Sequence, residues 1–151
     1  MAGCLDPAEL TTSSGKTYWI SKSRAEKMHG KMVDAVNFLR IENSLREIVI
    51  HESLNLAASA HSQDMYQQDR AWHFGADGSS PIERIAKFGF TGELIGENIS
   101  ETYEDDVSTL NAWMDQENTR SIILDKDANY MGLGWHQAED GKIWWTQIFG
   151  K

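Results

Sequence analysis

Cysteine and histidine side chains are the usual nucleophiles, general bases and zinc ligands of proteins, and this chain has one cysteine and five histidines. The single cysteine, Cys4, excludes an internal disulfide and any zinc site built on thiolates. No Gly-x-Ser-x-Gly sequence supplies a serine nucleophile. His61 falls on the apolar stripe of a predicted helix, which is typical of a hydrogen-bonded core histidine. Histidine and carboxylate side chains therefore remain as the candidates for any site.

Cys4 has a different candidate role, in attachment rather than chemistry. The sequence Ala2-Gly3-Cys4 is similar to the end of the processing box of bacterial lipoproteins, in which the cysteine receives the lipid. The alternative is a chance match in which Cys4 is an ordinary free thiol. Residues 11–15 are polar and end in glycine, and no apolar periodicity precedes residue 23, which favours a tether. We therefore expect residues 1–22 to form an N-terminal tail, with Cys4 as the candidate lipid-attachment residue.

The charge of the chain restricts its partners. There are 14 Lys+Arg against 23 Asp+Glu, a formal net charge of −9. This balance argues against nucleic acid and against docking on an anionic membrane, because both attract a positive field. No apolar run approaches the ~18 residues that a membrane-spanning helix needs, so a membrane tether would come through a lipidated Cys4. The length of 151 residues suits one domain, which we place at 23–151 and expect to be monomeric.

Apolar periodicity predicts helices that alternate with strands. Ser23 is the expected N-cap of the first helix, and Ser80-Pro81-Ile82-Glu83 has the form of a capping box with proline at the first helical position. The acidic run before residue 107 suits the positive end of a helix dipole. The predicted helices begin at or near 24, 53, 81 and 103, and the predicted strands cover 95–100, 131–135 and 143–149.

The last two strands flank a turn at Glu139-Asp140-Gly141, so they form an antiparallel hairpin. Helices mixed with such a hairpin predict an α+β fold, a three-layer α-β-α sandwich with a mainly antiparallel central sheet. The residues expected to be buried on one side of the sheet or the other are Leu54, Ala58, Met65, Val107, Leu110, Ile143, Trp145 and Phe149.

The order of these segments resembles the CAP superfamily (cysteine-rich secretory proteins, antigen 5 and plant pathogenesis-related group 1 proteins, the SCP-like domain) in its bacterial, disulfide-free form. The resemblance extends from Val36 to Gly150, and Gly96-Glu97-Asn98-Ile99 is its most specific part. The other matching segments, in chain order, are 37–43, 54–65, 73–84, 113–114, 118–124, 132–134 and 145–150. The resemblance implies an α-β-α sandwich, in agreement with the periodicity.

The resemblance also implies a concave site, where family members gather two histidines and two acidic residues and some bind zinc or another divalent cation. Carried over residue by residue, His73 is the first histidine and Glu97 the first acid. This chain has Thr119 at the place of the second histidine and Gln116 at that of the second acid, with Glu117 one step further. A threonine hydroxyl is a poor zinc ligand, and a helical step turns Glu117 by about 100° from Gln116. We therefore expect no cofactor, with His73 and Glu97 as the weak candidates for a metal.

Two functions remain open at this point. The first is a binding or interaction module outside the cytoplasm, secreted or lipid-anchored, with a groove around His73 and Glu97 that Gln116, Glu117 and Thr119 approach. Its ligand would be a small molecule, a lipid or a protein. The second is a peptidase-like or esterase-like hydrolase in which His73 and Glu97 act as a general-base pair, with or without a weakly bound divalent metal. Because half of the family's set is changed and no nucleophile is apparent, the sequence favours binding over turnover.

Overall fold

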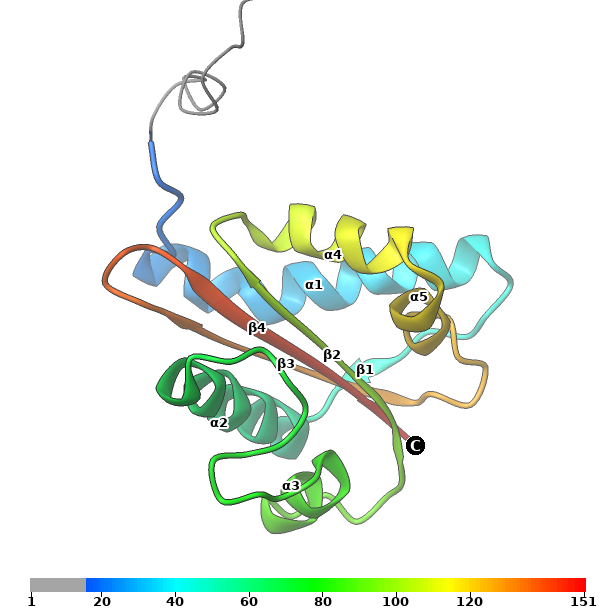
Figure 1. Ribbon diagram of the computed structural model, residues 1–151. Coiled ribbons are helices and arrows are strands. Elements are labelled where there is room, and N and C mark those ends of the chain that lie inside the picture. The colour runs from blue at the N-terminus through cyan, green and yellow to red at the C-terminus, as the bar shows by residue number, and fades with distance from the viewer. Residues whose placement is uncertain (1–15) are drawn as a thin grey trace, which may run out of the picture.

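A computed structural model describes residues 16–151, which form an α+β structure of three layers. One face of the central sheet is covered by α1 (Lys22–Glu42), α4 (Asp106–Asp115) and α5 (Glu117–Ile123), while α2 (Glu52–Gln68) and α3 (Pro81–Lys87) lie on the other face (Figure 1). The predicted α-β-α sandwich is therefore confirmed.

The sheet has four strands in the order β1-β3-β4-β2. These are β1 (Val49–Ile50), β2 (Leu94–Thr102), β3 (Tyr130–Gln137) and β4 (Ile143–Gly150). The pairs β3–β4 and β2–β4 are antiparallel, and the two residues of β1 pair in parallel with Tyr130 and Met131. The prediction of a mainly antiparallel sheet is confirmed, and β2 and β1 form its two edges.

Serine side chains cap the N-termini of α1 and α3. Ser21, not Ser23 as the sequence suggested, caps α1, because Ser21 is extended (φ −69°, ψ 162°) and its hydroxyl accepts from the Arg24 N–H at 3.2 Å. The capping box of α3 is confirmed, since the Ser80 hydroxyl accepts from the Glu83 N–H at 3.2 Å and Pro81 follows the cap. The cap at Ser80 thus fixes the direction in which the side chain of Arg84, four residues further on, projects from α3.

Most of the expected core residues are buried. Leu110 is 4% exposed, and six of the other seven have at most 1% of their surface exposed. The exception is Val107, which is 50% exposed, so its predicted burial is wrong. Leu110 and Trp113 occupy the inward face of α4, and Val107 lies at the rim of the cleft between α4 and α1. Its three-residue spacing from Leu110 is helical, but the Val107 side chain lines the open cleft between the two helices and is not part of the core.

Residues 16–20 lie against the domain. Tyr18 and Ile20 pack on the core beneath α1 and α4. The side-chain amide of Gln137 donates to the Tyr18 carbonyl at 2.8 Å and accepts from the Ile20 N–H at 2.9 Å. Cys4 and most of the expected tail lie outside the described residues. Within residues 16–151, no helix combines the length and apolar character needed to cross a membrane.

Candidate functional site

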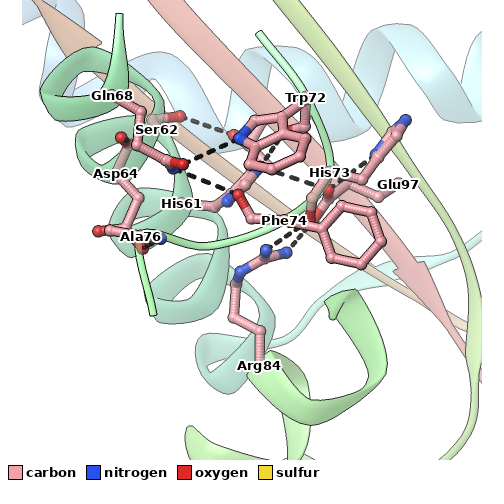
Figure 2. Close-up of polar contacts among 11 residues, drawn as sticks. His61, Ser62, Asp64, Gln68, Trp72, His73, Phe74, Ala76, Arg84 and Glu97 are labelled. Carbon is pink, nitrogen blue, oxygen red and sulfur yellow. Dashed lines mark hydrogen bonds and ion pairs between the residues drawn. The ribbon is translucent and has the colours of Figure 1, made fainter. Parts of the chain in front are cut away.

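The site is built around Glu97, which projects from the edge strand β2 and whose side chain is 1% exposed. The guanidinium of Arg84, 4% exposed on α3, donates from Nη1 to Glu97 Oε2 at 2.6 Å. The imidazole of His73 donates from Nδ1 to Glu97 Oε1 at 3.0 Å (Figure 2). The structure thus brings together the two residues that the resemblance paired, and it adds a buried cation that balances the carboxylate.

The same groups also hold the backbone of the segment that carries His73, residues 69–79, which we call the 69–79 loop. Arg84 Nη2 donates to the His73 carbonyl at 2.7 Å. His61 Nε2, on α2, lies 2.7 Å from the Trp72 carbonyl, so this nitrogen carries the proton and donates. Two consecutive carbonyls of the loop are therefore bonded to buried side chains.

Two further residues of α2 hold the loop through hydrogen bonds (Figure 2). Gln68 accepts from the Trp72 indole N–H at 3.0 Å and donates to the Phe74 carbonyl at 3.3 Å. Asp64 accepts from the Ala76 N–H at 3.1 Å. Because successive residues of the loop are bonded to α2 or α3, its conformation is ordered before any ligand arrives.

The 69–79 loop nevertheless exposes its side chains. His73 is 51% exposed at its side chain and Phe74 is 46% exposed. Because His73 Nδ1 is engaged by Glu97, Nε2 is the ring nitrogen left for another partner. The guanidinium of Arg70 stacks 3.8 Å above the Trp72 ring at the start of the loop. The loop therefore presents an imidazole nitrogen, a phenyl ring and a guanidinium to solvent.

His61 is a buried member of this cluster. It is 0% exposed, and its Nε2 lies 3.6 Å from Glu97 Oε1. Burial lowers the pKa of His61, and the opposing attraction of Glu97 is the smaller effect, so the ring is neutral at pH 7. The expectation of a hydrogen-bonded core histidine is confirmed. Its apolar helical position gave no sign that it also adjoins Glu97.

Arg84 is the residue that the sequence analysis missed. It lies within a segment that carried the family resemblance, yet no role was assigned to it. A signal was available, because a carboxylate buried on a strand requires a cationic partner and Arg84 follows directly after the capping box.

The other expected groove residues are arranged differently from the expectation. A helical step is expected from Gln116 to Glu117, but Gln116 is extended (φ −113°, ψ 132°) and separates α4 from α5. The Thr119 hydroxyl donates to the Trp113 carbonyl at the end of α4, at 2.5 Å, and the Gln116 and Glu117 side chains are exposed. Among residues 16–151, the polar contacts of the Glu97 carboxylate are with His61, His73 and Arg84.

This arrangement does not suit a divalent metal. Glu97 Oε2 accepts a hydrogen bond from the Arg84 guanidinium, and His61 Nε2 donates to the Trp72 carbonyl. The Thr119 hydroxyl donates to a carbonyl of α4. These atoms are therefore not available as metal ligands. His73 is left as a single accessible ligand, whereas zinc sites draw three or four from the protein. Within the described part of the chain, no three His, Cys, Asp or Glu side chains are placed to share an ion.

Comparison with known proteins gives consistent results. The family model described as cysteine-rich secretory protein family, CAP, matches residues 33–149. YkwD, an uncharacterized protein of Bacillus subtilis, is 30% identical over 144 residues, which are 95% of this chain and 55% of YkwD. YlbC, an uncharacterized membrane protein of the same organism, is 24% identical over 104 residues, 69% of this chain and 30% of YlbC. The chain thus spans about half or less of the length of these relatives.

Two solved structures share the fold. An extracellular protein with an SCP domain from Bacillus anthracis superposes with a TM-score of 0.76 at 22% identity, covering 99% of this chain and 45% of that one. An outer surface protein of Borrelia burgdorferi gives 0.73 at 18% identity, covering 91% of this chain and 98% of that one.

Proposed function

The chain belongs to the cysteine-rich secretory protein (CAP) family, and from the geometry of its site we propose that it is a binding module that recognises a ligand with the 69–79 loop. The observation that carries this proposal is the clamp beneath the loop: the buried pair of Arg84 and Glu97 holds both the carbonyl and the imidazole of His73, while the outer half of that ring stays exposed. A surface that is ordered in advance loses little conformational entropy when it binds.

The alternative, a hydrolase, is less well supported by the same contacts. A carboxylate strengthens histidine as a base by stabilising the imidazolium, as in catalytic triads. Here Arg84 Nη1 lies 2.6 Å from Glu97 Oε2, so a buried cation already balances the charge of this carboxylate. In the described part of the chain, no serine or cysteine side chain is hydrogen-bonded to His73. The contacts of Glu97 and His73 therefore support ligand binding better than acid–base catalysis.

We place this activity outside the cytoplasm. The similar proteins with solved structures are described as an extracellular protein and an outer surface protein, and one sequence relative as a membrane protein. Cys4 remains the candidate for a lipid anchor, and we expect the domain to act as a monomer without nucleic acid.

The exposed groups indicate the chemistry of the ligand, whether it is a small molecule, a lipid or a segment of a protein. Arg70 and His73 favour a hydrogen-bond acceptor or an anionic group, and Phe74 favours an apolar or aromatic body. Phenylacetate combines a carboxylate with a phenyl ring and is a small probe of both preferences.

The binding proposal is tested by NMR titration of the isotopically labelled protein with phenylacetate. We expect saturable shifts of the main-chain amide resonances of the 69–79 loop at millimolar probe, and their loss in His73→Ala and Phe74→Ala. The matched control is Phe38→Ala, which removes an exposed phenyl ring from α1 and should leave the titration unchanged. Shifts that persist in His73→Ala, or that vanish in Phe38→Ala, would contradict a site on the 69–79 loop.

The hydrolase alternative is tested with p-nitrophenyl acetate and with zinc. We expect the same slow hydrolysis from the wild-type protein, His73→Ala and Glu97→Gln, and no zinc binding below micromolar concentration by calorimetry. Multiple turnovers that require both His73 and Glu97 would replace the binding proposal with catalysis. Submicromolar zinc binding lost in His73→Ala would overturn the metal-free site.

A further inference from the structure

The outer edge of β3 is only partly covered by another strand. The strand β1 pairs with Tyr130 and Met131 and then ends. In the β3–β4 ladder, the even-numbered residues of β3 exchange main-chain hydrogen bonds with β4. The same alternation continues just past the end of β3, where the Ala138 N–H donates to the Lys142 carbonyl. Odd-numbered residues must then direct their N–H and C=O groups away from β4, as Met131 does when it accepts from the His51 N–H. Leu133 and Trp135 therefore direct main-chain groups toward an edge that no strand within residues 16–151 covers.

Side chains replace the missing strand at Leu133 but not at Trp135. The Leu133 N–H donates to Asn55 Oδ1 at 3.0 Å, and His29 Nε2 donates to the Leu133 carbonyl at 2.8 Å. Within residues 16–151, no such hydrogen bond is made by the outward N–H or C=O of Trp135. One donor and one acceptor thus remain at the spacing of a β-ladder.

A groove of about 350 Å³ runs along this edge between α1 and α2. On α2, Glu52, Asn55, Leu56 and Ser59 recur at three- and four-residue steps, so they share the face beside the strand. The helix lies this close because β3 has glycine at position 134, where a Cβ would overlap the backbone nitrogen of Ser59. Leu56 is 48% exposed, although it is apolar. The groove therefore combines open main-chain groups with an apolar wall.

We propose that this groove, the β3-edge groove, binds an extended basic segment of a partner protein, which pairs with Trp135 as an added strand. Paired main-chain groups would supply affinity, and an apolar side chain of the segment would pack on Leu56. The segment should be basic because Glu52 is the carboxylate that lines the groove and the whole chain carries a net charge of −9. The groove lies at the opposite edge of the sheet from β2 and Glu97, so this inference does not depend on the function proposed for the 69–79 loop.

The first test asks whether the edge at Trp135 is open. Amide hydrogen exchange followed by NMR on the whole chain should show the Trp135 N–H exchanging much faster than those of Leu133, bonded to Asn55, and His136, bonded in the ladder. Protection of Trp135 equal to that of its two neighbours would mean that the edge is already paired, and would overturn the proposal.

The second test identifies the partner chemistry with phage-displayed random heptapeptides. We expect enriched sequences in which apolar residues alternate with Lys or Arg. Their synthetic forms should slow the exchange of the Trp135 N–H and bind roughly tenfold more weakly when the residue opposite Trp135 is N-methylated, since one hydrogen bond is lost. Leu56→Gln, which adds no charge, should also weaken binding about tenfold or more, by loss of the apolar wall. Phe38→Gln, a matched change at a more exposed apolar residue on α1, should leave binding unchanged.

Three outcomes would overturn the proposal. They are no enrichment over phage without a displayed peptide, equal affinity of the selected peptides for the wild-type protein and Leu56→Gln, and selection of acidic rather than basic sequences.

Discussion

Replacing Glu97 by glutamine tests the clamp beneath the 69–79 loop most directly. The substitution preserves shape and one acceptor oxygen but removes the negative charge. Arg84 is 4% exposed at its side chain, so its guanidinium would remain buried without a counter-charge. Removing one partner of a buried ion pair typically costs about 3–5 kcal/mol of unfolding free energy. In His73→Ala the lost hydrogen bond is at a half-exposed ring, and the expected cost is only about 1 kcal/mol.

The double variant separates burial of an unpaired charge from loss of packing. In Glu97→Gln combined with Arg84→Met, no unpaired cation is left buried beside residue 97, so we expect much of the stability lost in Glu97→Gln to return. Part of the loss should remain, because the bond from Arg84 to the His73 carbonyl is also removed.

The measurement is urea unfolding followed by circular dichroism, with thermal unfolding as a second probe. For a chain of this length the expected loss in Glu97→Gln corresponds to a fall in Tm of roughly 6 to 20 °C. A loss below about 1 kcal/mol, or a double variant less stable than Glu97→Gln, would refute the conclusion that charge pairing at Glu97 holds the site.

Other predictions concern the pH dependence of stability through His61 and the packing of α4, β3 and α1. Because the pKa of His61 is lowered in the fold, the unfolded chain binds a proton that the folded chain does not. As the pH falls below about 6.5, the unfolding free energy should therefore fall by up to ~1.4 kcal/mol per pH unit. Urea unfolding measured from pH 7.5 to 5 should show a shallower fall in His61→Gln. Leu110→Ala should cost about 2–5 kcal/mol and Val107→Ala less than about 1 kcal/mol in urea unfolding, and equal losses would contradict the observed face of α4. Gly134→Ala should destabilise the protein by about 3 kcal/mol or more, because the added methyl group would overlap the α2 backbone. Gly30→Ala, where nothing lies within 4 Å of the added Cβ, should instead stabilise the protein by about 0.5–1 kcal/mol. If thermal unfolding shows that Gly134→Ala is tolerated, α2 can move away from β3.

The sequence by itself determined the layer architecture and most of the elements. Helical and strand periodicities arise from local geometry, so they placed α2, α3 and the β3–β4 hairpin close to their observed bounds. They also identified a core in which seven of eight residues are buried. The pairing of His73 with Glu97 came from resemblance to a family, because residues 24 positions apart carry no local signal of contact.

The tertiary structure alone decided what those side chains do. Arg84 becomes the counter-charge of Glu97, and His61 their buried neighbour, because α2, α3 and β2 converge from three separate parts of the chain. Thr119 faces α4 because the chain extends at Gln116, a break that uninterrupted helical spacing did not reveal. Val107 is exposed because burial depends on whether a neighbouring helix covers a residue. The open edge at Trp135 follows likewise from β1 ending after two residues. Periodicity specifies a face within one element, whereas a site depends on charges and main-chain groups that distant elements bring together.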